Sequence, residues 1–97
     1  MTFGKLLKSL RNEKRVSIKQ LAAEVGLNYT YISKLENSKV NPSSKVISKF
    51  SDYFNYSSDE LMLAADKIPK DILEILKNNP QETVIYLRRR FGGRVTE

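Results

Sequence analysis

The stretch "SIKQLAAEVGLNYTYISKLENSK" (Ser17–Lys39) contains a single glycine between two segments with helical patterns. Ser17 with Gln20 three residues later forms a capping box, in which side chains bond the free amides of a helix start. Gly26 suits the end of that helix because it accepts a positive φ without a Cβ clash. Asn28 can cap the next helix. The stretch therefore predicts two short helices joined by a tight turn, the helix-turn-helix unit.

The apolar residues of the stretch indicate how the two helices would pack. Ala22 is small enough to let the helix axes approach, and Ile32 and Leu35 form the buried face of the second helix. Asn37 can end that helix because asparagine tolerates the left-handed conformation. The outer face of the second helix would then be rigid and prominent, with a width that fits the major groove of DNA, about 12 Å.

The rest of the chain also contains residues typical of helix ends and shows no strand pattern. Residues 2–65 predict five short helices, the fourth capped by Ser43 or Ser44. Pro69 and Pro80 stand at first helical positions of two more, where the missing N–H costs nothing. The fold class is therefore all-α, and we place a soft boundary near Asp66, between a domain of residues 1–65 and a helical hairpin of residues 66–97.

Charge is unevenly distributed along the 97 residues, whose net charge is +6. Residues 1–50 carry ten Lys/Arg against three Asp/Glu, whereas residues 51–97 carry seven against eight. A basic half beside a near-neutral half suggests a unit that binds a polyanion plus a second unit. Solvated surface lysines would explain the same composition.

The absence of histidine and cysteine excludes most catalytic chemistry. Zinc sites and Ser-His-Asp or Cys-His arrangements need these residues, and the sequence has no phosphate-binding glycine loop. We therefore expect no enzyme, no metal and no cofactor. The chain has no apolar run of about 18 residues and no secretory signal, so we expect a cytoplasmic protein without a membrane partner.

From Phe3 to Met62 the chain resembles the DNA-binding domain of Cro/CI-type repressors, the XRE family of helix-turn-helix regulators. The matching elements, in order, are Arg11 in "LRNEK", Ser17, "QLAAEVG", Ile32, "LEN" at 35–37, Pro42 and "FSDYFNYSSDEL". The resemblance implies a five-helix lambda-repressor-like domain, here with a C-terminal two-helix extension, that usually binds operator DNA as a two-fold dimer. It also implies that Arg11 pairs with Glu36. Three residues depart from the family pattern: Ser38 and Asn55 where glycine is common, and Ser44 where leucine is common.

A helix of residues 28–36 would therefore be the recognition helix, whose N-terminal residues face the bases. We predict base contacts from Tyr29, Thr30, Ser33 and Lys34. Tyr31 follows the flank of the helix, so a phosphate contact or packing on the first helix is expected instead. The predicted phosphate contacts, several at helix starts, are Arg11, Ser17, Tyr31, Asn37, Lys39, Asn41, Ser43 and Ser44. Ordinary capping, turn formation and solvated charge are the alternatives for these residues.

The C-terminal hairpin carries more apolar residues than a simple cap needs. We predict that Ile72, Leu76, Val84, Leu87 and Phe91 build or extend a homodimer interface, because a palindromic operator needs a dimer. The alternative is an antitoxin or similar protein whose hairpin binds a protein partner, such as a toxin or co-regulator, and which autoregulates through the same DNA-binding domain. Arg88–Arg94 would be a second phosphate contact or a solvated helix end. Between these readings we favour a sequence-specific regulator, a repressor, with double-stranded DNA as partner.

Overall fold

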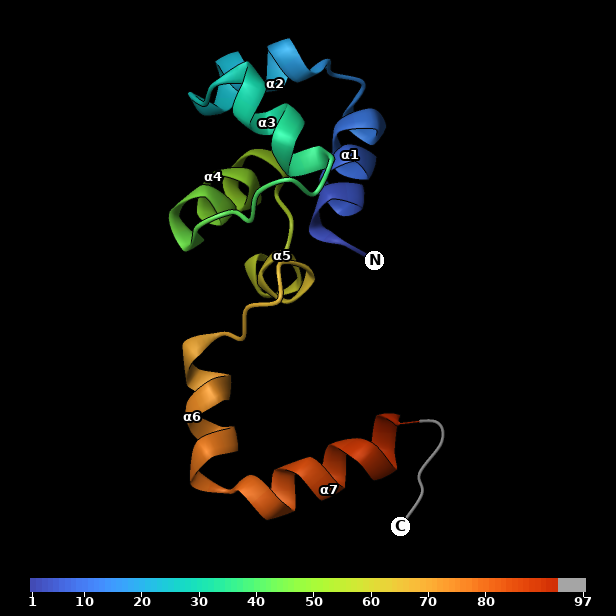
Figure 1. Cartoon of the computed structure of the whole chain (residues 1–97), viewed down its shortest axis with the longest axis vertical. Helices are drawn as coiled ribbons and strands as arrows, with labels where there is room; N and C mark the ends of the chain where they lie inside the picture. Colours follow the sequence, from blue (N-terminus) through green and yellow to red (C-terminus); the bar gives the residue numbers. More distant parts are fainter. Residues whose placement is uncertain (93–97) are drawn as a thin grey trace. The chain divides into compact units, whose positions relative to one another are not determined.

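The computed structural model describes residues 1–92, which form seven α-helices and no strand (Figure 1). In chain order these are α1 (Phe3–Lys14), α2 (Ile18–Val25), α3 (Tyr29–Glu36), α4 (Ser44–Phe54), α5 (Ser58–Ala64), α6 (Lys70–Asn78) and α7 (Pro80–Phe91). They divide into two compact units, Met1–Lys67 and a second that begins at Ile68. The predicted all-α class, with five helices and a two-helix extension, is confirmed.

Short polar side chains start the helices of the first unit. The side chains of Thr2, Ser17, Asn28, Ser43 and Ser57 each accept a backbone N–H of the helix that follows. Each such cap satisfies a donor that has no partner within the helix, which contributes about 1 kcal/mol. The cap of α4 is thereby settled as Ser43, and Ser44 is the first residue of the helix.

Positive φ angles mark the ends of several helices, and one of them lies beside the expected position. Gly26 ends α2 at φ 69° and Asn55 ends α4 at φ 51°. After α3 the left-handed residue is Ser38, at φ 58°, whereas Asn37 has φ −94°. Asn37 does end α3 as its cap, but the expectation that it takes this conformation is wrong. The Ser38 and Lys39 N–H groups bond the Leu35 and Lys34 carbonyls, so the chain reverses one residue later, at Ser38.

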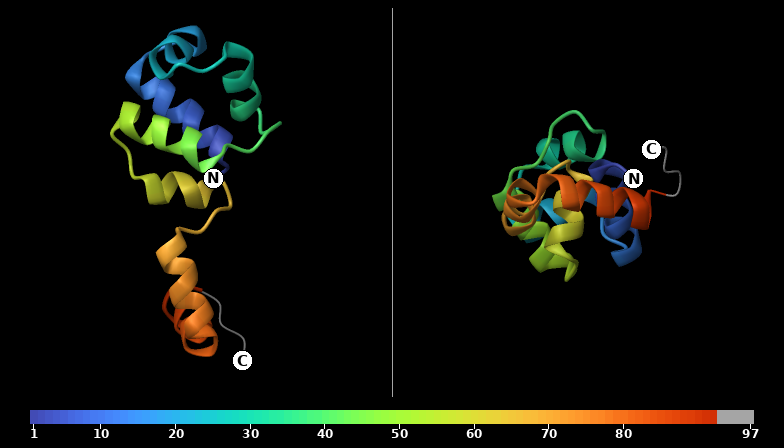
Figure 2. Two further views of the ribbon diagram at one scale, coloured as in Figure 1. Left: turned by 90° about the vertical axis from the view of Figure 1, so that its left-hand side faces the viewer. Right: turned by 90° about the horizontal axis from the view of Figure 1, so that it is seen from below.

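The core of the first unit lies where helices α1 to α5 meet (Figures 1 and 2). It is built from apolar residues of all five helices and from the residue after α5, namely Phe3, Leu7, Leu10, Leu21, Ala22, Ile32, Leu35, Ile47, Phe50, Leu61 and Ala65. Fully burying one such large side chain contributes about 1.5–3 kcal/mol. This core fixes α3 against α1 and α2, which are its main packing partners.

The second unit has no buried core within the described residues. Its two helices meet at Asn79, whose side-chain amide donates to the Ile75 carbonyl at 3.1 Å, and the Thr83 hydroxyl donates to the Asn79 carbonyl at 2.6 Å. From this junction α6 and α7 run in different directions, so they are side by side only near Asn79 (Figures 1 and 2). No residue of either helix is buried. Arg94, part of the predicted basic end, lies outside the described residues.

Candidate nucleic-acid interface

The turn between α2 and α3 is held by backbone geometry and by one side chain. Ser17 Oγ accepts the Gln20 N–H at 3.0 Å at the start of α2, and the Leu27 N–H bonds the Ala22 carbonyl after its end. Asn28 Oδ1 then accepts the N–H of Thr30 at 2.8 Å. These bonds set where α3 begins, so the orientation of its first turn is determined locally.

The side of α3 that faces away from the core carries all four residues predicted to read bases. Tyr29 is 48% exposed, Thr30 and Lys34 are exposed, and Ser33 is half-buried. Thr30, Ser33 and Lys34 follow Tyr29 by one, four and five residues. At about 100° per residue, the four side chains lie within about 140° of the helix circumference and so form one face. The structure thus brings together hydroxyl, phenol and ammonium groups on one helix face, which can donate and accept hydrogen bonds.

The two tyrosines of α3 have different surroundings. Tyr31 is half-buried and packs against the core, whereas Tyr29 projects from the first residue of the helix. Both rings add apolar surface, but only that of Tyr29 is free for an external partner over about half of its area. This difference follows from helix geometry, because Tyr31 is adjacent to the fully buried Ile32.

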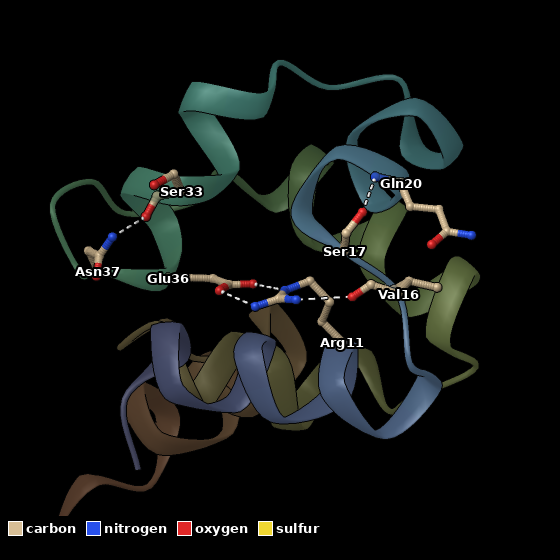
Figure 3. Close-up of polar contacts among 7 residues, drawn as sticks. All are labelled: Arg11, Val16, Ser17, Gln20, Ser33, Glu36 and Asn37. Carbon is tan, nitrogen blue, oxygen red and sulfur yellow. Dashed lines mark hydrogen bonds and ion pairs between the residues drawn. The ribbon is translucent and has the colours of Figure 1, made fainter.

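A second set of polar residues lies at the end of α3. The Asn37 side-chain amide donates to the Ser33 carbonyl at 2.9 Å (Figure 3), and the Lys39 N–H donates to the Lys34 carbonyl at 2.8 Å. The Ser33 carbonyl also accepts the Asn37 backbone N–H at 3.1 Å, and the side-chain amide oxygen of Asn37 takes no part in these bonds. The Lys39 side chain is exposed at the start of the loop that leads to α4.

The remaining predicted phosphate contacts are of two kinds. Ser43 is exposed, and its oxygen accepts the Val46 N–H at 3.2 Å, which leaves the hydroxyl hydrogen for another acceptor. Ser44 is exposed beside it. Asn41, in contrast, donates its amide to the Ala65 carbonyl at 3.3 Å and so ties the loop to the residue after α5. The hydroxyls of Ser43 and Ser44 are therefore freer to donate to a phosphate than the amide of Asn41.

Arg11 and Glu36 form the one ion pair found among the described residues (Figure 3). Arg11 Nε lies 2.6 Å from Glu36 Oε2, and a second guanidinium nitrogen donates to Oε1 at 3.0 Å. The third nitrogen donates to the Val16 carbonyl at 3.0 Å. The hydrogen bonds and attraction of Glu36 raise the pKa of Arg11, against the effect of partial burial. The pair therefore joins α1, the α1–α2 connection and the end of α3.

Two structural residues were not anticipated from the sequence. Gly4 lies where α1 crosses the end of α3, and a Cβ placed there would be 2.6 Å from the carbonyl oxygens of Leu35 and Glu36. A glycine inside a strong helix pattern was the available signal. Lys49 Nζ reaches the Val25 carbonyl at 3.5 Å, near the negative end of the α2 dipole. Nothing in the local pattern of α4 indicates that contact.

The predicted interface residues of the second unit are on its surface. Ile72 is 43% exposed, Val84 38%, Leu87 44% and Phe91 68%, while Leu76 is half-buried. More than a third of each of the other four side chains is thus uncovered among the described residues. In residues 1–92 no group of His, Cys, Asp and Glu is arranged to hold a metal ion. No helix of that range is both long and apolar enough to span a bilayer.

A family model described as helix-turn-helix matches residues 7–61 of the chain. The ImmF control region 10 kDa protein of Bacillus phage phi105 is 28% identical over 68 residues, which are 70% of this chain and 76% of that protein. The restriction-modification controller C.AhdI from Aeromonas hydrophila is 32% identical, with a TM-score of 0.57 over 61% of this chain and 89% of its own. SinR, a master regulator of biofilm formation solved in complex with DNA, is 33% identical, with a TM-score of 0.58 over 62% of this chain and 97% of its own.

Proposed function

This chain belongs to the Cro/CI-type (XRE) family of helix-turn-helix DNA-binding transcriptional regulators, and we propose that it is a repressor that binds a palindromic operator as a homodimer. The observation that carries the proposal is the exposed face of α3. Its tyrosine, threonine, serine and lysine project from a helix whose other side is locked into the core. A rigid helix with short polar groups on one face suits direct readout in the major groove.

In the proposed complex the exposed face of α3 reads the bases, from its first residue to Lys34. The Thr30 hydroxyl can bond several base edges and its methyl can contact thymine, while Lys34 donates to guanine O6 or N7. The exposed ring of Tyr29 packs on thymine methyl groups or bonds a phosphate through its hydroxyl. Ser33, which lies between them and is half-buried, is in position for a short contact to one base.

The proposed phosphate contacts surround this face and set register and affinity without reading sequence. They come from helix starts and loop residues, namely Arg11, Ser17, Tyr31, Asn37, Lys39, Asn41, Ser43 and Ser44. Ser17 and Ser43 support the proposal best, because each combines a free hydroxyl hydrogen with the positive end of a helix dipole. Arg11 contributes from the guanidinium hydrogens that Glu36 and Val16 do not use.

The homodimer is proposed from the uncovered apolar residues of α6 and α7. A two-fold operator places recognition helices about 34 Å apart, which requires a fixed pair of domains. An amphipathic helix with no buried residue has its apolar stripe available for another chain. Leu87→Asp should therefore lower the sedimentation mass of the full-length protein, and Gln81→Asp, elsewhere on α7, is the matched control. An unchanged mass for Leu87→Asp would contradict this dimer surface.

One selection experiment tests the proposed function as a whole. Full-length protein is incubated with a pool of random duplexes, and the bound fraction is sequenced over several rounds. We expect an inverted repeat whose half-sites are about one helical turn, or a multiple of it, apart. Enrichment of no sequence above the starting pool would refute sequence-specific binding, and a single unrepeated half-site would refute the dimer on DNA.

Substitutions of two lysines distinguish base contacts from phosphate contacts. Lys34→Ala should cost about 1–3 kcal/mol on the selected site and relax preference at one base pair. Lys39→Ala should weaken binding to all duplexes alike and reduce the salt slope by about one unit. Titrations of selected and scrambled duplexes at several salt concentrations distinguish the two. Equal losses on both duplexes for Lys34→Ala would remove it from the base contacts.

A second candidate function uses the same surface of the second unit. The exposed apolar residues of α6 and α7 would also suit a protein partner, such as a toxin or co-regulator, with DNA binding used for autoregulation. This reading predicts that the protein purified from its native cells carries a stoichiometric partner, whereas the first predicts a homodimer alone. Mass spectrometry of the native complex decides between them.

A further inference from the structure

The helix α7 has apolar residues on two opposite sides, and only one side belongs to the dimer surface proposed above. With a turn of about 100° per residue, Val84, Leu87 and Phe91 lie together on one side, and Ile85 and Tyr86 lie toward the other. The only residue of α7 that is not exposed is Thr83, whose hydroxyl donates to the Asn79 carbonyl at the junction with α6. Ile85 and Tyr86 are 49% and 61% exposed, compared with 38% for Val84 and 44% for Leu87, so both have open surface for a partner.

The side with Ile85 and Tyr86 is an open, shallow depression between side chains of α7 alone, which we call the hollow. Its other lining residues are charged: Glu82, Arg89 and Arg90. The Arg90 guanidinium lies 4.9 Å from the centre of the Phe91 ring, so Arg90 is at the edge of the hollow nearest Phe91. In the described part of the chain neither Glu82 nor Arg89 forms an ion pair. An acid, two apolar residues and a base thus follow each other along one face of the helix.

This order is symmetric about the peptide bond between residues 85 and 86. Glu82 lies as far before that bond as Arg89 lies after it. If two such helices pair antiparallel across a two-fold axis at this point, Ile85 of each copy meets Tyr86 of the other. Glu82 of each copy then meets Arg89 of the other. A two-fold contact must be self-complementary in this way, with one patch used by both subunits.

We propose that the Glu82–Arg89 face of α7 pairs antiparallel with the same face of a second copy of this chain. The contact buries the aromatic and aliphatic side chains at its centre and places two ion pairs at its rim, the arrangement usual in protein interfaces. It lies on the opposite side of α7 from Leu87, so it is separate from the proposed dimer contact. Resting on that dimer, it would join two dimers into a tetramer that can hold two operators.

A charge swap in the full-length protein tests this pairing. Glu82→Arg and Arg89→Glu each place like charges opposite each other twice, whereas the double variant restores both pairs with reversed sign. We expect each single variant to weaken the association of dimers by about tenfold or more, and the double variant to recover most of it. Arg88→Glu, with the same change of charge outside the hollow, is the matched control. Sedimentation equilibrium over a concentration series measures each step.

The outcomes separate this contact from the proposed dimer. Loss of tetramer with dimer retained in the single variants, and recovery in the double variant, supports the pairing. Single variants that assemble like wild type, or a double variant as weak as the singles, would overturn it. A wild-type protein that never exceeds a dimer, and whose dimer is insensitive to Glu82→Arg, would overturn it as well. In Leu87→Asp, a remaining monomer–dimer step that responds to Glu82→Arg would support the α7 pairing even if the proposed dimer surface is wrong.

Discussion

Replacing Glu36 by glutamine tests how far the first unit depends on the pair that joins α1 to α3. Glutamine keeps one acceptor for the guanidinium of Arg11 but removes the negative charge and turns an amide N–H₂ toward a cation. Charge-assisted hydrogen bonds of this kind contribute about 1.5–3 kcal/mol each. The two side chains are only 12% and 5% exposed, so water replaces little of the loss. We therefore expect Glu36→Gln to lower the free energy of unfolding by about 2–3 kcal/mol.

A double-mutant cycle with Arg11→Met separates the pair from the rest of each side chain. The coupling free energy should be about 2 kcal/mol, because both partners are largely removed from solvent. In a thermal melt followed by circular dichroism, the single variants should unfold about 10 °C or more below the wild type. Glu24→Gln, on the exposed side of α2, is the control for loss of one surface carboxylate. A coupling below about 0.5 kcal/mol, the value of an exposed pair, would refute this reasoning.

The direction in which this coupling free energy changes at basic pH can also be predicted. Glu36 raises the pKa of Arg11 above an already high value. A group with a raised pKa contributes its stability below the unfolded pKa and loses it only as the pH rises through the folded pKa. The coupling should therefore be unchanged between about pH 7 and about pH 10.

Four further substitutions test the packing around α3 and the face that it exposes. Gly4→Ala should cost about 1–3 kcal/mol of stability, measured by urea unfolding, since its Cβ would lie 2.6 Å from two backbone oxygens of α3; an unchanged midpoint would contradict the close crossing. Ser38→Gly should raise stability by about 0.5–1 kcal/mol in the same assay, because Ser38 has φ 58° and glycine adopts this angle freely; a loss would mean that its side chain has an unseen role. Tyr29→Ala should weaken operator binding with little change in melting temperature, whereas Tyr31→Ala should lower the melting temperature, and indistinguishable effects in both assays would contradict their different burial.

The sequence alone was enough to predict the helices and the face that α3 presents. Caps such as Ser17 and Asn28 act on amides two or three residues away, so their effect is local and can be read from the order of residues. The apolar spacing of Ile32 and Leu35 determines which side of α3 is buried, and thereby leaves Thr30 and Lys34 on the exposed side. Periodicity carries this information because a helix repeats every 3.6 residues.

Other features depended on the tertiary structure, because they join residues that are distant in sequence. The need for glycine at position 4 comes from the carbonyl oxygens of α3, and the tie from Asn41 ends on the Ala65 carbonyl. The apolar residues of α6 and α7 were evident in the sequence, but only the spatial course of the two helices decided that neither covers the other.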